Sequence, residues 1–176
     1  IMSSDWSSDV CSSDLLQQGL ITLERERLDL GDLIGEAAGL LTMSAEHKGI
    51  SFEMNIPAGT AVSADKNALS TVIRNLLSNA VKFSRSGGTV EINAAPAGDG
   101  TVRIAVKDYG IGMSEGLQKN LFQIESMEPR SGTADERGTG LGLGLCKELV
   151  EKMGGTLHVE SRENEGSALS FSLPAG

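Results

Sequence analysis

Three polar side chains on one stretch of the chain have the chemistry to bind a metal–phosphate complex. Asn75, Asn79 and Lys82 follow one another at spacing i, i+4 and i+7, which places them on a single face of an α-helix. An amide oxygen can enter the octahedral shell of Mg²⁺ that phosphate oxygens and water complete, and a lysine ammonium can pair with a phosphate. A solvated helix face is the alternative interpretation, so these residues need support from elsewhere in the sequence.

Alternating glycines ahead of the last amphipathic stretch provide a second candidate site for an anion. Gly138, Gly140, Gly142 and Gly144 directly precede it. A helix N-terminus exposes backbone N–H groups and a partial positive charge, and a phosphate can approach them closely where side chains are absent. Leucine, not the lysine of a P-loop, follows the last glycine, and the Rossmann spacing is not met. Tight packing of helix against sheet is the alternative, and the polar helix face favours the phosphate site.

A third candidate is a carboxylate at the end of a predicted strand. Asp108 is followed by Gly110 and Gly112 in the segment KDYGIGMS. A carboxylate can accept a hydrogen bond from an exocyclic amine such as that of adenine, and the glycines leave room for a flat ring. A simple turn between strand and helix is the alternative.

The amino-acid composition limits the kinds of molecule that the chain is expected to bind and the cellular compartment in which it is expected to act. The chain has 176 residues, enough for one domain, and its 24 acidic against 15 basic residues argue against binding nucleic acid or an anionic membrane through overall charge. Cys11 and Cys146 lack the spacing of a zinc site or a redox pair, and no apolar run is long enough to span a bilayer. We therefore expect a cytoplasmic domain that binds no nucleic acid, within a parent protein that could be anchored in the inner membrane.

Hydrophobic periodicity predicts the elements that position these groups. We expect strands at 21–30, 50–56, 89–96, 101–108, 156–161 and 167–173, and helices at 32–47, 66–82, 114–122 and 142–153. Asp65 is the expected N-cap of the second helix, and residues 123–137 are expected to form a loop. Residues 1–14 repeat Ser-Ser-Asp and resemble translated adapter sequence, so they are interpreted as a disordered, non-native tail. Helices interspersed with mostly antiparallel strands predict a two-layer α/β sandwich.

Taken in order, four segments resemble the catalytic ATP-binding domain of sensor histidine kinases, within the group that includes gyrase, the Hsp90 chaperones and the MutL repair proteins. The segments are RNLLSNAVKFS as the asparagine box, DYGIGM as the first glycine box, LFQI as the phenylalanine box and RGTGLGLGLCKELVEKMGG as the second glycine box. The resemblance covers about residues 20–174 and identifies residues 21–176 as such a domain. It implies the Bergerat-type sandwich, a mixed, mostly antiparallel sheet covered by helices, with ATP beneath a mobile lid.

The resemblance also implies roles for individual residues. Asn79 would hold Mg²⁺, Asn75 and Lys82 would contact the phosphates, and Asp108 would bind the adenine amine. Gly110 and Gly112 would shape the pocket for the adenine base, and Phe122 would pack beneath the lid. Arg137 or Arg130 would reach the terminal phosphate. The lid hinge and the phosphate cradle would consist of Gly138, Thr139, Gly140, Leu141 and Gly142.

Two departures from the wider group shape the functional expectation. The ATPase branches place a water-activating glutamate where this chain has Asn75, so transfer to a protein acceptor is favoured over hydrolysis. Neither His47 nor His158 fits an acceptor histidine, so residues 15–20 are interpreted as the remnant of a missing dimerisation helix.

We expect the chain to transfer the ATP γ-phosphoryl group to a histidine on a separate dimerisation and phosphotransfer domain, and to be inactive alone. In a two-component system, the parent kinase would be a homodimer that passes the phosphoryl group to a response regulator receiver domain. The alternatives are a noncatalytic nucleotide-sensing module, and an ATPase or serine kinase of the same fold.

Overall fold

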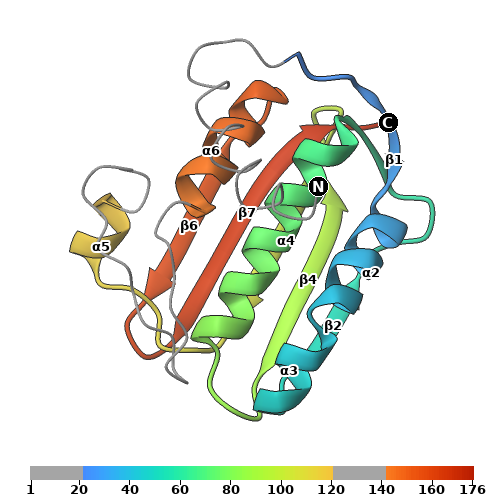
Figure 1. Cartoon of the computed structure of the whole chain (residues 1–176). Coiled ribbons are helices and arrows are strands. Elements are labelled where there is room, and N and C mark those ends of the chain that lie inside the picture. The colour runs from blue at the N-terminus through green and yellow to red at the C-terminus, as the bar shows by residue number, and fades with distance from the viewer. Residues whose placement is uncertain (1–21, 121–141) are drawn as a thin grey trace, which may run out of the picture.

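One face of a five-stranded sheet is covered by helices in the computed structural model, which describes residues 22–120 and 142–176 (Figure 1). The strand order is β2-β4-β5-β7-β6. Strand β2 pairs in parallel with β4, and the other neighbouring pairs are antiparallel. The strands are β2 (Ser51–Asn55), β4 (Thr89–Pro96), β5 (Thr101–Asp108), β6 (Leu157–Arg162) and β7 (Gly166–Pro174). The predicted two-layer sandwich with a mixed, mostly antiparallel sheet is confirmed.

Apolar and polar residues alternate along the two strands of the hairpin that β4 and β5 form. Ile92 lies opposite Val106 on the buried face, and Glu91 lies opposite Lys107 on the other face. A shift of the pairing by one residue would turn each apolar side chain to the wrong face, so the pattern fixes the register. The strand bounds predicted for this hairpin are confirmed.

Helix α4 (Lys66–Phe83) carries the apolar stripe that closes the core against the sheet. Asp65 is its N-cap, and Oδ1 of Asp65 accepts a hydrogen bond of 2.9 Å from the Ala68 amide. The second oxygen, Oδ2, accepts one of 3.0 Å from the Glu24 amide. The buried stripe consists of Leu69, Val72, Ile73, Leu76, Leu77, Ala80 and Val81. The predicted cap and helix are both confirmed.

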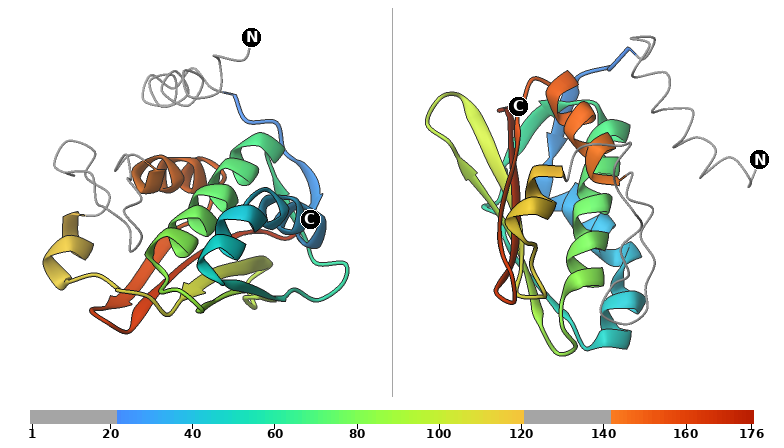
Figure 2. Two further views of the ribbon diagram at one scale, coloured as in Figure 1. Left: turned by 60° about the horizontal axis from the view of Figure 1, so that its bottom comes forward. Right: turned by 90° about the vertical axis from the view of Figure 1, so that its left-hand side faces the viewer.

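Two further helices flank α4 on the same face of the sheet, α2 (Leu30–Leu40) on one side and α6 (Gly142–Lys152) on the other (Figure 1). The edge-on view in Figure 2 shows the sheet as one layer and the helices as the second. The short helices α3 (Thr42–Lys48) and α5 (Glu115–Asn120) follow α2 and β5 in the chain. Within residues 22–120 and 142–176, no helix combines the length and apolarity needed to cross a membrane.

The first predicted strand is shorter than expected. Of residues 22–30, which the structure describes, only β1 (Glu26–Asp29) is a strand, and it pairs with β3 (Ala61–Ala64), which was not predicted. Asp29 ends β1 because its Oδ1 accepts a hydrogen bond of 3.1 Å from the Asp32 amide and caps α2. Local capping therefore overrides the strand-like alternation of the sequence.

The helix predicted at 32–47 is divided into α2 and α3 at Leu41. The Leu41 backbone has φ −100° and ψ 1°, and its amide bonds the Ala38 carbonyl at 3.1 Å. Gly39, just before the break, lowers helix propensity. The apolar periodicity continues across the break, so periodicity alone does not indicate where the helix divides.

Several predictions concern segments outside the described residues. These are the disordered tail at 1–14, the helix remnant at 15–20, the loop at 123–137 and the mobile ATP lid. They stay predictions.

Replacing Asp65 with alanine should lower the free energy of unfolding by about 1–2 kcal/mol, because it removes the acceptor for a helix N-terminal amide. Urea denaturation measures this change. Asp65→Asn keeps one oxygen acceptor and should lose less stability. Equal stability of the alanine variant and the wild type would contradict the capping role.

Candidate nucleotide-binding site

The amide-bearing face of α4 borders its buried stripe instead of lying fully in solvent. Asn75 and Asn79 are half-buried, and Lys82 is only 8% exposed. The Lys82 Nζ atom lies 5.2 Å from the centroid of the Phe83 ring. The simple solvated face considered from sequence therefore does not describe these three residues.

Helix α6 lies beside this face. The Cys146 thiol of α6 is fully buried, and its Sγ atom lies 3.9 Å from the Val72 carbonyl oxygen of α4. Burial raises the pKa of Cys146 to about 12, an effect opposed by a hydrogen bond with the Asn75 side chain. The face of α4 that carries the asparagines thus lies against α6, the helix that starts within the second glycine box.

The C-terminal end of α4 meets the first glycine box. The Ile111 amide donates a hydrogen bond of 3.1 Å to the Phe83 carbonyl. A Cβ atom on Gly110 would lie 1.8 Å from that same oxygen, and one on Gly112 would lie 1.9 Å from the Arg162 carbonyl. Both glycines therefore permit close backbone packing. Their role in shaping a base pocket stays a prediction.

Asp108 is placed at the end of β5 beside this loop and is 4% exposed. Its Oδ1 atom accepts a hydrogen bond of 3.0 Å from the Gly110 amide. Burial raises the pKa of Asp108, while backbone hydrogen bonds from Gly110 and Ser167 oppose that rise. A carboxylate buried in this way has few competing water contacts, which suits recognition of a single amine donor.

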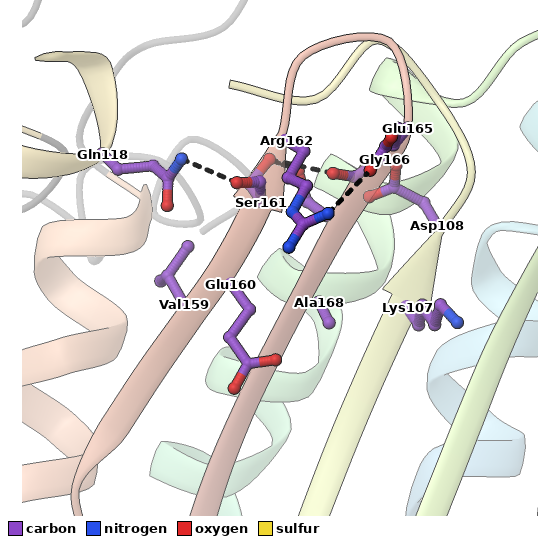
Figure 3. A pocket seen from close by; sticks show the side chains of 11 residues that line it. Lys107, Asp108, Gln118, Val159, Glu160, Ser161, Arg162, Glu165, Gly166 and Ala168 are labelled. Atoms are coloured by element: carbon purple, nitrogen blue, oxygen red, sulfur yellow. Dashed lines mark hydrogen bonds and ion pairs between the residues drawn. The ribbon is translucent and has the colours of Figure 1, made fainter. Parts of the chain in front are cut away.

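A hydroxyl cluster that the sequence did not reveal fixes the loop after Asp108. The Ser161 Oγ atom accepts a hydrogen bond of 2.8 Å from the Met113 amide and lies 2.8 Å from the Ser167 Oγ atom. The Gln118 side chain of α5 donates a hydrogen bond of 2.9 Å to the Ser161 carbonyl (Figure 3). Serines in a strand are common, and no motif marks this pair.

A pocket of about 490 Å³ lies next to these residues (Figure 3). Asp108 is part of its lining, but Asn75, Asn79 and Lys82 are not. The lining also includes Lys107, which alternates with buried neighbours and so belongs to the sheet face away from α4. This pocket therefore shares Asp108 with the predicted site but does not include the predicted phosphate-binding residues.

Among the sequence-predicted residues, the described ones come from three neighbouring parts of the fold. Asn75, Asn79 and Lys82 lie on α4, and Gly142 begins α6. Asp108 ends β5, and Gly110 and Gly112 lie in the loop that follows it and packs against the end of α4. The remaining predicted positions lie outside the described residues. They are Phe122, Arg130, Arg137, Gly138, Thr139, Gly140 and Leu141.

Comparison with known proteins identifies the family. The family model described as histidine kinase-, DNA gyrase B-, and HSP90-like ATPase matches residues 64–176. The chain belongs to this ATPase family. It is an ATP-binding domain of the histidine kinase type, as the following relatives indicate.

Histidine protein kinase DivJ of Caulobacter vibrioides is 32% identical over 173 residues, which are 97% of this chain and 28% of the relative. The structure of full-length ShkA in complex with AMPPNP is 29% identical with a TM-score of 0.74, over 89% of this chain and 32% of that chain. The catalytic domain of histidine kinase ThkA is 28% identical with a TM-score of 0.75, over 86% of this chain and 96% of that domain.

ThkA in complex with response regulator protein TrrA is 22% identical with a TM-score of 0.73, over 99% of this chain and 49% of that chain, and shows likeness of fold alone. This chain spans less than a third of the length of the curated relatives that it matches.

The residues of this histidine kinase-like domain fit a metal bound together with a nucleotide. Within the described parts of the chain, no three His, Cys, Asp or Glu side chains gather to hold a metal ion. The neutral amide oxygens of Asn75 and Asn79 carry no charge to hold a free divalent cation. Mg²⁺ accepts such sparse protein donors when substrate phosphates supply the other oxygens.

Substituting alanine for Gly110 should lower the free energy of unfolding by roughly 1–3 kcal/mol, because the new methyl group collides with the Phe83 carbonyl. Gly116→Ala is the matched control, since a Cβ atom there meets nothing within 4 Å and the residue lies in α5. Thermal and urea unfolding compare the two. Equal stability of both variants would show that Gly110 is not required for packing.

The raised pKa of Asp108 predicts a pH-dependent difference from Asp108→Asn. The folded state binds the Asp108 proton more tightly than the unfolded state, so this stabilising contribution is complete below the unfolded pKa of about 4 and is lost as pH rises through the folded pKa. The stability of the asparagine variant relative to wild type should therefore increase above about pH 4. Urea denaturation across pH tests this, and parallel curves would contradict it.

Proposed function

We propose that this domain binds Mg-ATP and transfers its γ-phosphoryl group to a histidine on a separate dimerisation domain of a two-component sensor kinase. The observation that carries the proposal is the position of α4. Helix α4 contacts α6 where the Cys146 Sγ atom lies 3.9 Å from the Val72 carbonyl oxygen, and its last carbonyl accepts a hydrogen bond from the loop after Asp108. One nucleotide could therefore meet the amide face, the carboxylate and the start of α6.

In this proposal each group binds a different part of the nucleotide. Asp108 accepts a hydrogen bond from the adenine amine, Asn75 and Lys82 contact the phosphates, and Asn79 supplies an oxygen to Mg²⁺. The divalent cation, when bound, offsets the charge of the phosphates during transfer. The buried Lys82 ammonium adds a fixed positive charge that solvent screens little.

The side chain at position 75 favours transfer over hydrolysis. An asparagine amide takes up no proton near neutral pH, so Asn75 provides no general base for a water molecule. An imidazole nitrogen carries its own lone pair and needs no such base. That nitrogen attacks the γ-phosphorus, the bond to the β–γ bridging oxygen breaks, and ADP leaves.

The acceptor histidine is proposed to come from another domain. His47 lies in the last turn of α3 and His158 lies in β6, and both are exposed. The histidine kinase relatives are much longer than this chain and have room for further domains. We propose a homodimeric parent with a cytoplasmic catalytic domain, and a response regulator receiver domain as the next acceptor.

Mixing the chain with a cognate dimerisation domain and γ-labelled ATP tests the proposal. It should yield an acid-labile phosphohistidine on the added domain. ATP binding without transfer to any histidine would instead support a noncatalytic nucleotide-sensing module. Steady release of phosphate without an acceptor would support an ATPase.

Asn79→Ala should lower Mg-dependent phosphotransfer by about a hundredfold, a loss typical of one missing electrostatic contact in an active site. Adenosine binding, which needs no metal, should be unchanged. Asn67→Ala is the matched control because Asn67 lies exposed in the first turn of the same helix. Equal transfer rates of both variants would remove Asn79 from the proposed site.

Asp108→Asn should weaken ATP binding by roughly one to two orders of magnitude, because it replaces a charged acceptor of a buried hydrogen bond. Titration of the isolated chain with ATP measures the effect. An unchanged dissociation constant would show that Asp108 does not recognise the base.

A further inference from the structure

A buried lysine from outside α4 bonds the C-terminal end of that helix. Lys48, the last residue of α3, is 5% exposed. Its Nζ atom donates hydrogen bonds of 2.9 Å to the carbonyl oxygens of both Val81 and Lys82. A lysine side chain is rarely buried unless its ammonium group has hydrogen-bond partners. The two carbonyl oxygens of α4 are such partners for Lys48.

Lys48 completes the hydrogen bonding of the last four carbonyls of α4, which no intrahelical amide can satisfy. The Ala80 carbonyl accepts from Ser84, and the Phe83 carbonyl accepts from the Ile111 amide. The two carbonyls between them accept from Lys48. The ammonium also places a positive charge at the negative end of the helix dipole.

The backbone around Lys48 is itself held in place. The Gly87 amide donates a hydrogen bond of 2.8 Å to the Lys48 carbonyl, and the Ser51 amide donates one of 3.1 Å to the Gly88 carbonyl. Gly49, which ends α3, has φ 68° and turns the chain into β2. These hydrogen bonds fix the backbone between α3 and β2, and so they fix the position from which the Lys48 side chain reaches α4.

We propose that Lys48 is a positioning residue for the phosphate end of the nucleotide site. This inference rests on the proposed function, because it concerns Asn79 and Lys82 as ligands of Mg-ATP. Lys48 bonds the carbonyl of Lys82 itself, and Asn79 lies one turn earlier. Loss of the ammonium removes its hydrogen bonds to the buried Val81 and Lys82 residues, and the last turn of α4 then shifts or frays to hydrate their carbonyls.

The adenine end of the site depends much less on Lys48. Asp108 is held in β5 by pairing with both β4 and β7, opposite Val90 and Ser167. These ladder contacts do not involve α3. Loss of Lys48 should therefore weaken phosphate binding more than adenosine binding, a split that a general loss of stability does not produce.

The test compares Lys48→Met with wild type under conditions where circular dichroism shows both to be folded. Lys48→Met should weaken Mg-ATP binding by about fivefold to tenfold, the effect of one or two lost hydrogen bonds, and adenosine binding by less than about twofold. Amide exchange of Ser84, which follows the last turn of α4, should accelerate selectively. Lys66→Met, an exposed lysine in the first turn of α4, should change neither affinity.

Lys48→Arg should restore most of the Mg-ATP affinity, because arginine retains the charge and the donors. If Lys48→Met does not fold, Lys48→Gln undergoes the same comparison. Unchanged Mg-ATP affinity in a folded variant, or equal losses for Mg-ATP and adenosine, would overturn the positioning role alone. A wild-type chain that binds neither ligand would overturn the proposed function as well.

Discussion

Burial of the apolar stripe of α4 against the sheet is the constraint on which the rest of the site depends. Leu69, Val72, Leu76 and Leu77 are completely buried, and each such side chain contributes about 1.5–3 kcal/mol to stability. Turning the helix by one residue would expose part of this stripe and bury polar groups. Core packing therefore fixes which side of α4 carries Asn75 and Asn79, before any ligand is considered.

Close approach of backbone segments then builds the surroundings of Asp108. A Cβ atom on Gly110, Gly112 or Gly166 would lie 1.8, 1.9 or 2.1 Å from a carbonyl oxygen, far closer than non-bonded atoms can approach. The end of α4, the loop after β5 and the turn between β6 and β7 consequently contact one another through main-chain atoms. Glycines that look like a ligand motif in sequence also meet a packing requirement here.

The parts of the fold that follow local patterns were predictable, and the parts that depend on distant contacts were not. Alternation defined β4 and β5, and Asp65 with the apolar stripe defined α4. The break at Leu41 and the pairing of β1 with β3 left no periodic signal. In the candidate site, the motifs of the sequence predicted the residues on α4 and Asp108. They did not predict the contact of Ser161 with Ser167 or that of Lys48 with α4, because no motif marks the segments that these contacts join.

These contacts give α4 fixed ends. Asp65 bonds the first turn and the incoming segment at Glu24, while Lys48 and Ile111 bond the last turn. A helix fixed at both ends presents its polar face in one orientation, so little conformational freedom has to be lost when a nucleotide binds. Such preorganisation suits phosphoryl transfer, in which a protein contributes positioning and charge and leaves the covalent change to the nucleotide and its acceptor. Under the proposed function, the stability of the helix termini therefore contributes to the chemistry of the site.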